Sequence, residues 1–200
     1  MLKQIIVFSI GCAATFVLAD TPRQLDFTEV QPYEPKEYLE FIQYSCSMHC
    51  YMDWQTSAVS TLSAQGSNSY RPENLFDANL STAWVEGQKD DGVGSEFILA
   101  FTESVSPKGI PLTGFELTNG YAKNSGTWAA NSRIKQLAVY HNDKWVYTFN
   151  LLDTPTPQQI DFDGVPLSAG DELRFRILSV YPGNRYKDTA LSELLIYGAH

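Results

Sequence analysis

Seven segments between residues 95 and 198 have the length and the residue pattern of β-strands. In ELRFRILSV (172–180), the apolar Leu173, Phe175 and Ile177 alternate with charged residues. Because successive side chains of a strand point to opposite faces, this period of two is typical of a strand with one buried and one solvated face. Gly, Pro, Asn or Asp residues bound the seven segments, which are 95–101, 114–119, 133–140, 144–151, 158–162, 172–180 and 191–198. They predict an all-β sandwich or jelly roll over residues 56–200.

The composition fits one globular domain with appendages. The chain has 200 residues, of which 44% are hydrophobic and 18% are charged, enough to bury one sizeable core. The 14 Lys and Arg against 23 Asp and Glu give a formal net charge of −9. Such a charge repels nucleic-acid backbones and anionic lipid surfaces at long range. We therefore expect neutral or cationic partners and no nucleic acid.

The first nineteen residues have the pattern of a cleaved secretory signal. Lys3 precedes an apolar stretch that starts at Ile5, and Val-Leu-Ala ends this stretch at Ala19. Cleavage after Ala19 predicts a secreted, periplasmic or cell-envelope protein with no transmembrane segment in the mature chain. Residues 1–19 are therefore excluded from the fold.

Two other interpretations of this N-terminal segment are less favoured. Ser9, Gly11 and Thr15 interrupt the apolar run, which is short for a membrane anchor. The surroundings of Cys12 are similar to those of a lipoprotein acceptor cysteine, but Ser9 stands where such a signal normally carries Leu. Lipoprotein anchoring at Cys12 is therefore the weaker alternative.

Residues 20–55 form an acidic, proline-containing extension. They hold seven acidic residues against two basic ones, with prolines at 22, 32 and 35. Residues 35–44 could form a short helix, because proline is favoured at the first helical position. We interpret the rest of the extension as a linker with a small packed turn, whose aromatic residues could dock on the following domain.

The mature chain keeps two cysteines, Cys46 and Cys50, in SCSMHCYMDW. In an oxidising compartment, a close pair of this kind predicts one local disulfide. The alternative is a metal site that includes His49. Two thiols and one imidazole leave a tetrahedral ion one ligand short, so the disulfide is favoured.

Three long connecting segments, 74–87, 119–133 and 181–193, combine aromatic and polar residues. Sugar recognition uses this chemistry, because the C–H face of a pyranose packs on an aromatic ring while polar groups bond its hydroxyls. The candidate glycan-binding residues are Trp84, Glu86, Asn119, Tyr121, Lys123, Trp128, Asn131, Arg133, Tyr186, Lys187 and Asp188. Some of the rings could instead be core residues under the loops. This alternative is stronger for Trp84, since Ala83 and Val85 flank it.

Five motifs along the chain resemble those of the NADase-type glycan-binding domain. They are YRPENLFDANLSTAWVEG (70–87), GVGSEFILAF (92–101), TGFELTNGYAK (113–123), NSRIKQL (131–137) and YPGNRYKDTALSELLIYG (181–198). This family is a discoidin-like member of the galactose-binding-like jelly-roll superfamily, and the similarity spans nearly all of residues 56–200. It implies a secreted or surface carbohydrate-binding module of a type found beside bacterial NAD glycohydrolases. No second stretch of these 200 residues is long enough for that enzyme.

The same resemblance implies a structural calcium site but no required cofactor. Many discoidin-like jelly rolls hold calcium with an aspartate and a threonine of one loop and a glutamate of the last strand. The matching positions here are Asp77, Thr82 and Glu193. Calcium prefers six to eight oxygen ligands, so backbone carbonyls would have to complete the site. The alternative is that Asp77 caps a turn and Glu193 pairs with a base.

Catalysis is not favoured by the sequence. Asp77, Glu86, Glu96 and Asp188 could pair as a glycosidase acid and base, but surface acids are abundant in an acidic chain. The three histidines lie in no nucleophile or metal motif, and no glycine-rich phosphate loop is present. We therefore expect a module that is not an enzyme.

Two functions of a non-enzymatic module remain. The first is glycan binding, and the alternative is a protein-interaction or envelope-structural module without a sugar pocket. A pocket with an exposed ring and convergent polar groups favours a glycan. Loops closed over buried rings, with a flat apolar patch elsewhere, favour a protein partner.

Overall fold

All seven predicted strands are present in the structure, a computed structural model that describes residues 21–29, 40, 48–104, 106 and 108–198. They are β5 (Glu96–Ser104), β6 (Ile110–Asn119), β7 (Ser132–His141), β8 (Lys144–Asn150), β9 (Gln158–Leu167), β10 (Glu172–Tyr181) and β11 (Thr189–Gly198). Four further strands are β1 (Arg23–Asp26), β2 (Thr28–Glu29), β3 (Met52–Ala58) and β4 (Trp84–Val85). The described part of the chain is thus predominantly β.

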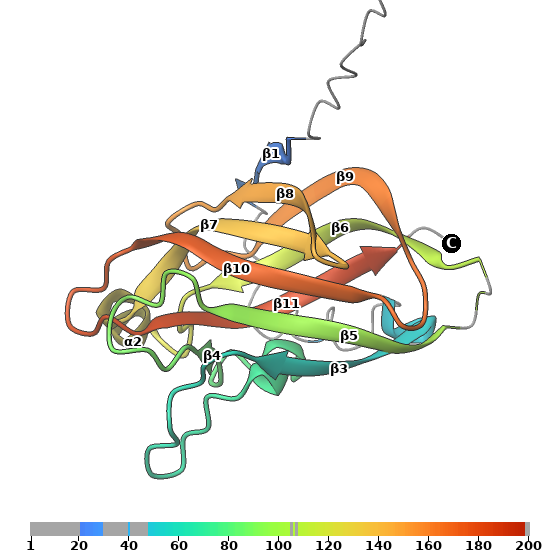
Figure 1. Cartoon of the computed structure of the whole chain (residues 1–200). Helices are drawn as coiled ribbons and strands as arrows, with labels where there is room; N and C mark the ends of the chain where they lie inside the picture. Colours follow the sequence, from blue (N-terminus) through green and yellow to red (C-terminus); the bar gives the residue numbers. More distant parts are fainter. Residues whose placement is uncertain (1–20, 30–39, 41–47, 105, 107, 199–200) are drawn as a thin grey trace, which may run out of the picture.

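The strands form two layers that face each other (Figure 1). One layer has the order β3-β5-β10-β7-β8, with β1 beside β8. The other has the order β2-β9-β6-β11, with β4 beside β11. A short parallel pairing of β11 with β7, at Thr189↔Ser132 and Ala190↔Arg133, joins the layers at one end. The predicted β-sandwich is therefore confirmed.

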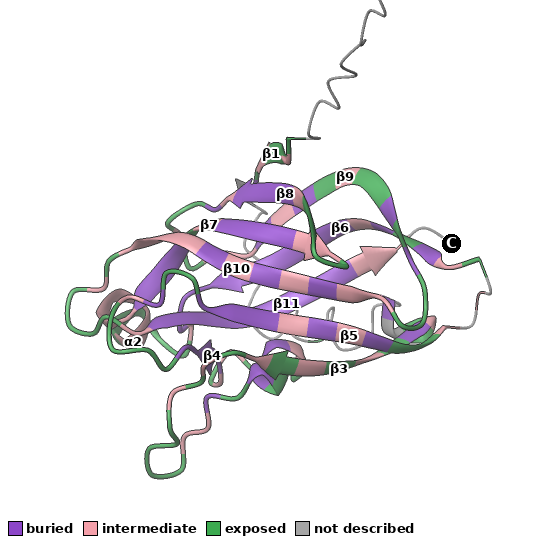
Figure 2. Cartoon of the chain, in the orientation of Figure 1, coloured by how far each residue is buried: buried purple, intermediate pink, exposed green. Residues whose placement is uncertain are grey.

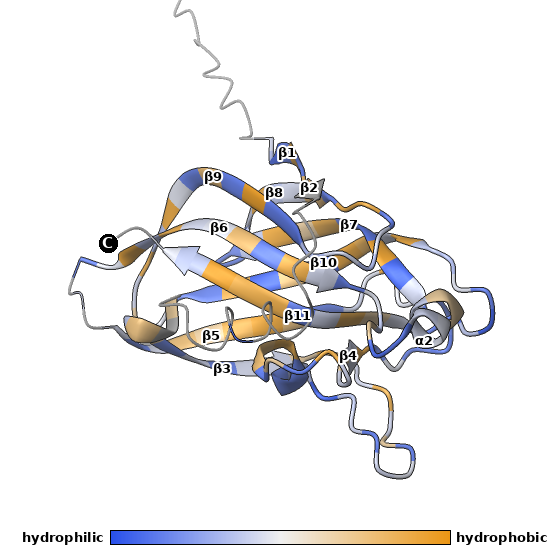
Figure 3. Cartoon of the chain, turned by 180° about the vertical axis from the view of Figure 1, so that it is seen from behind, coloured by the Kyte–Doolittle hydropathy of each residue, from blue (hydrophilic) through white to orange (hydrophobic). Residues whose placement is uncertain are grey.

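The core lies between the two layers, and phenylalanine rings dominate its centre. Phe97 of β5 stacks on Phe175 of β10 with ring centroids 4.6 Å apart. Phe115 of β6, in the opposite layer, meets Phe175 edge to face at 5.4 Å. All three rings are almost fully buried. Figure 2 shows that the centres of these strands are buried, and Figure 3 shows apolar residues along them. Burying each ring stabilises the fold by about 1.5–3 kcal/mol.

Three strands that begin in the 20–55 extension pair with the sandwich: β1, β2 and β3. β1 runs parallel to β8, and β2 runs antiparallel to β9. Between these strands, Phe27 is buried and its ring meets Phe149 edge to face at 5.4 Å. β3 starts at Met52 and therefore crosses the boundary expected at residue 56. The helix expected over 35–44 lies outside the described residues, apart from Glu40.

The helices of the described ranges are short. They are η1 (Met48–Cys50), η2 (Pro72–Phe76) and α2 (Ser125–Ala130). Proline at the start of η2 suits the first position of a helix, because its missing N–H has no partner there. Within the part of the chain that the structure describes, no helix is long and apolar enough to span a membrane.

We expect Cys46 and Cys50 to be linked to each other in exported protein. Cys50 is disulfide-bonded, and Cys46 lies outside the described residues, so the pairing stays a prediction. Peptide mass spectrometry after alkylation without reductant should find one cross-linked species joining the two. Recovery of both cysteines as alkylated thiols would contradict the pairing.

Candidate functional site

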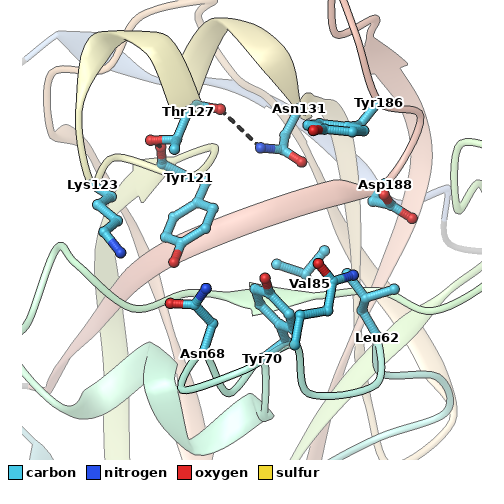
Figure 4. A pocket seen from close by; sticks show the side chains of 11 residues that line it. Leu62, Asn68, Tyr70, Val85, Tyr121, Lys123, Thr127, Asn131, Tyr186 and Asp188 are labelled. Atoms are coloured by element: carbon cyan, nitrogen blue, oxygen red, sulfur yellow. Dashed lines mark hydrogen bonds between the residues drawn. The ribbon is translucent and has the colours of Figure 1, made fainter.

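A cavity of about 250 Å³ opens beside α2 (Figure 4). Its walls come from the loop after β3, from β4, from the segment between β6 and β7, and from the loop between β10 and β11. The lining residues are Leu62, Gln65, Asn68, Tyr70, Val85, Tyr121, Lys123, Thr127, Asn131, Tyr186 and Asp188. Five of the predicted glycan-binding residues therefore line one cavity: Tyr121, Lys123, Asn131, Tyr186 and Asp188.

Two tyrosines form the apolar floor of the cavity. Tyr70 and Tyr121 meet edge to face with ring centroids 6.3 Å apart, and both are 7% exposed. They pack with Val85 in a small cluster separate from the main core. The Tyr121 hydroxyl donates to the Ser81 carbonyl at 3.1 Å, and burial raises the pKa of this hydroxyl. Tyr121 is therefore a fixed, neutral part of the floor.

Local capping chemistry positions the wall that α2 contributes. The Asn124 side chain accepts from the Thr127 N–H at 2.9 Å, while the Asn124 N–H donates to the Thr127 hydroxyl at 3.1 Å. This reciprocal capping box satisfies N–H groups at the start of the helix. At the other end, Asn131 Nδ2 donates to the Thr127 carbonyl at 2.8 Å. Thr127 and Asn131 are thereby held at the cavity.

Four polar side chains of the rim have no hydrogen bond or ion pair with any described residue: Gln65, Asn68, Lys123 and Asp188. Figure 4 shows Lys123 and Asp188 on opposite sides of the cavity. The Tyr186 ring is 44% exposed, and the Arg185 guanidinium lies 5.0 Å from its centroid. An exposed ring and uncommitted donors and acceptors therefore converge on one space.

Trp84 and Asn119 belong to the scaffold and not to the cavity. Trp84 is fully buried, meets Phe97 edge to face at 5.2 Å and donates from Nε1 to the Ser60 carbonyl at 3.3 Å. This is the core position that its apolar neighbours indicated. Asn119 is also fully buried, and its amide bonds both the N–H and the carbonyl of Ile134 at 3.0 and 2.7 Å. Neither side chain can reach a ligand in the cavity.

Arg133 and Trp128 support the cavity wall from behind. The Arg133 guanidinium donates twice to the Asp153 carboxylate, at 3.0 and 2.9 Å, and to the Asn131 and Pro182 carbonyls at 3.0 Å each. It also lies 4.7 Å from the centroid of the Trp128 ring. Trp128 Nε1 is occupied by a backbone carbonyl at 2.9 Å. Four of the five N–H groups of Arg133 are thus engaged, and Arg133 joins the β6–β7 segment to the β10–β11 loop.

Glu86 and Lys187 lie outside the cavity lining. Glu86 is fully buried and accepts from the Gln88 and Thr189 N–H groups at 2.7 and 3.2 Å. Burial raises the pKa of this carboxyl, and the negative charges of Asp188 and Asp90 add to the rise. Lys187 is exposed and is not among the lining residues. We leave both out of the proposed site.

Leu62, Gln65, Asn68 and Tyr70 line the cavity but were not predicted from the sequence. They belong to the loop between β3 and η2, where Gln65 and Asn68 pair through their backbones across a turn. Gly66 has φ +62° in this turn, which glycine adopts without strain. The run Gln-Gly-Ser-Asn is typical of a turn, but such a run does not indicate that the turn returns to the other loops.

The three candidate calcium ligands come together in space. The Thr82 hydroxyl donates to Asp77 at 2.8 Å, and the Asn79 N–H donates to the Glu193 carboxyl at 2.7 Å. Burial, with the nearby Asp77 charge, raises the pKa of Glu193 to about 9. The described residues contain no group of three His, Cys, Asp or Glu suited to a metal. A cation here would therefore need the Thr82 hydroxyl and backbone carbonyls as well as two carboxylates, a hard-oxygen set that fits calcium.

The two-layered sheet with its cavity formed by loops defines a discoidin-like jelly-roll module. The chain belongs to the NAD glycohydrolase translocation F5/8 type C domain family, whose model matches residues 49–197. The resemblance read from the five sequence motifs is thereby confirmed. A search of curated proteins found no match.

Solved structures with the same fold include parts of carbohydrate-active proteins. A putative chitobiase fragment from Bacteroides thetaiotaomicron has TM-score 0.50 and 19% identity, over 74% of this chain and 93% of that chain. Arabinofuranosyltransferase AftD from Mycobacteria has TM-score 0.52 and 13% identity, over 73% of this chain and 11% of that chain. The family 32 carbohydrate-binding module of Streptococcus pneumoniae EndoD has TM-score 0.48 and 11% identity, over 72% of this chain and 96% of that chain. For the chitobiase fragment and AftD, the likeness at these identities concerns the fold alone.

Proposed function

We propose that this chain is a non-catalytic module that binds glycans in the cavity beside α2. The observation that carries the proposal is the combination of an apolar tyrosine floor, an exposed Tyr186 ring and polar rim groups without partners among the described residues. A pyranose presents apolar C–H faces and hydroxyls that both donate and accept. Such a ligand satisfies rings and rim groups together.

The charges of the rim favour a neutral or weakly charged sugar. The carboxylate of Asp188 can accept from two sugar hydroxyls, while the Lys123 ammonium can donate to ring or hydroxyl oxygens on the other side. The amides of Asn68 and Asn131 add donors and acceptors between them. A single shallow site of this kind gives affinities of about micromolar to millimolar, so firm attachment would need several copies.

The cavity chemistry supports binding without hydrolysis. Glycosidases use two carboxyl groups that flank the scissile bond. Among the described residues that line the cavity, Asp188 is the one carboxylate. The signal-like sequence of residues 1–19 supports the further proposal that the module is exported to the cell envelope or the medium.

We also propose that Asp77, Thr82 and Glu193 hold a structural calcium ion. None of the three lines the cavity, so the ion would stabilise the loop and tie it to β11 without serving as a ligand of the glycan. Glu193 is 3% exposed, and no basic side chain is among the causes of its pKa shift. A cation would favour the ionised form of this carboxyl.

Replacing Tyr186 by Ala should weaken retention on a responsive glycan by about tenfold or more, with little change in melting temperature. The reason is that the ring is exposed in the cavity and contributes little to the core, whereas stacking on a sugar buries one of its faces. A glycan array with residues 20–200 would identify the ligand, and titration would give the two dissociation constants. Leu152→Ala is the matched control, because Leu152 is 39% exposed and lies outside the cavity lining.

Two outcomes would oppose the proposed function. Normal glycan binding by Tyr186→Ala would remove the cavity as the site. Absence of binding to every glycan, together with stoichiometric complex formation with a protein, would favour the interaction-module alternative.

A further inference from the structure

A second cavity, of about 260 Å³, lies between β1, the start of β8 and β9. No residue that the structure describes lines both this cavity and the cavity beside α2. Among the described residues, two aromatic side chains stand out as exposed large hydrophobic groups: Tyr186, which lines the first cavity, and Trp145, which lines the second. Exposed rings on this surface thus coincide with cavities. This coincidence suggests that the second cavity also takes a ligand.

The Trp145 ring is held in place although it is 38% exposed. It stacks on Tyr140 across the β7–β8 hairpin, with centroids 5.8 Å apart and planes inclined by 27°. Its Nε1 donates to the Tyr147 carbonyl at 3.0 Å. Tyr140 in turn lies under the guanidinium groups of Arg174 and Arg176, at 5.8 and 5.2 Å. A ring fixed in this way loses little conformational entropy when a ligand packs on it.

The opposite wall of the cavity is a bulge of β9. Two steps along β6, from Leu112 to Gly114, face four steps along β9, from Val165 to Asp161. The buried Tyr147 hydroxyl donates to the Asp163 carbonyl at 2.9 Å and so fixes the bulge. Asp163 also pairs with Arg23 of β1 at 2.6 Å. The N-terminal extension therefore builds part of this cavity.

The cavity combines the chemical groups that recognise a sugar residue. Trp145 offers an aromatic surface, Asp163 offers carboxylate acceptors, and Arg23 and Lys144 offer donors. The space is small and concave. A protein partner would instead need an interface of roughly 1,000 Å² or more.

We propose that this cavity is a second glycan-binding site, in which a pyranose packs on Trp145 and its hydroxyls bond Asp163, Arg23 and Lys144. The module then has two separate sites, one at Tyr186 and one at Trp145. Two sites on one domain let a branched or repeating glycan bind with higher apparent affinity than either site gives alone. The proposal extends the function proposed above and is testable separately from it.

The test is an NMR titration of ¹⁵N-labelled residues 20–200. The probes are methyl glycosides of glucose, galactose, mannose, N-acetylglucosamine, N-acetylgalactosamine and glucuronic acid, and of sialic acid, each raised to tens of millimolar. The chain has four tryptophans, whose indole N–H signals are assigned with single Trp→Phe variants. We expect at least one glycoside to shift the Trp145 indole signal and the backbone amides of Asp163 and Gly164.

Variants separate the two sites. Trp145→Ala should abolish the shifts at Asp163 and Gly164 and weaken binding there at least tenfold, while the shifts at Lys123 and Thr127 remain. Tyr186→Ala should do the reverse. The matched control is Leu152→Ala, because Leu152 is 39% exposed and lines neither cavity. The spectral dispersion of each variant reports whether it is folded.

Each result decides between the two proposals. Shifts at Lys123 and Thr127 without any at Trp145 overturn the second site and leave the proposed function in place. Shifts at Trp145 alone support the second site and overturn the cavity beside α2. The second site is also overturned if the amide shifts at Asp163 and Gly164 persist in the Trp145→Ala variant. It is overturned as well if no glycoside causes shifts at the first site or at the second.

Discussion

Calcium should raise the melting temperature of this protein, and Glu193→Gln should abolish that rise. A ligand that binds only the folded state stabilises it by about 2.7 kcal/mol when its concentration is 100 times the dissociation constant. Asp77 and Glu193 come from opposite ends of the jelly roll sequence, so one ion between them would oppose separation of β11 from the loop after η2. The free energy of stabilisation that produces the rise should be of this order at millimolar calcium if the dissociation constant is in the micromolar range.

The physical reason for the Glu193→Gln effect lies in the burial of the carboxyl. Glu193 is 3% exposed, and burial next to Asp77 raises its pKa to about 9. Without a cation the carboxyl is therefore protonated at neutral pH, and a glutamine amide of nearly the same shape replaces it at little cost. Calcium needs the ionised carboxylate as a ligand, and the amide does not supply that charge.

Scanning calorimetry of both proteins, with calcium, with magnesium and with chelator, measures the effect. Glu86→Gln is the matched control, because Glu86 is also a buried carboxyl but accepts from N–H groups elsewhere in the fold. It should keep the calcium response. An equal calcium response in the Glu193→Gln variant, or no response in the parent chain, would remove the proposed site.

The strands could be predicted from the sequence because alternation reports burial directly. In β10, Leu173, Phe175 and Ile177 are fully buried, and the charged residues between them are more exposed, as their spacing requires. β4 was not predicted, since two residues are too few to show a period. β1 and β2 are also short, and their positions depend on tertiary pairing with β8 and β9.

The candidate site could be predicted only in part, because residue type does not reveal which way a side chain faces. Tyr121, Lys123 and Tyr186 belong to aromatic and polar loops and do line the cavity. Asn119 and Arg133 belong to the same sequence segment, 119–133, but they lie in β6 and β7, where their polar groups satisfy backbone carbonyls and a carboxylate inside the protein. Composition cannot separate a polar group that bonds a ligand from one that holds a loop. Long-range contacts decide this.

Arg133→Ala should lower the free energy of unfolding by about 2–4 kcal/mol, which is the range for removing a buried, hydrogen-bonded charge. The Arg133 side chain is 9% exposed, whereas that of Asp153 is 38% exposed. Because water can solvate the Asp153 carboxylate left behind, the loss should fall in the lower half of this range. The bonds to the Asn131 and Pro182 carbonyls account for much of it, since both carbonyls would lose a charged donor.

This substitution also distinguishes support of the cavity from contact with the glycan. Urea unfolding gives the stability, and glycan binding is measured at a temperature where more than about nine tenths of the variant is folded. Arg133→Lys should be nearly as destabilised, because an ammonium cannot make the paired bonds to Asp153 and reach both carbonyls. Lys187→Ala, which removes an exposed cation from the same loop region, should change stability by less than about 0.5 kcal/mol.

Since Arg133 holds Asn131 and the β10–β11 loop in place, the folded variant should bind the glycan more weakly in proportion to the disorder of that wall. Full stability combined with lost binding would instead make Arg133 a direct glycan contact, contrary to the hydrogen bonds that occupy its guanidinium.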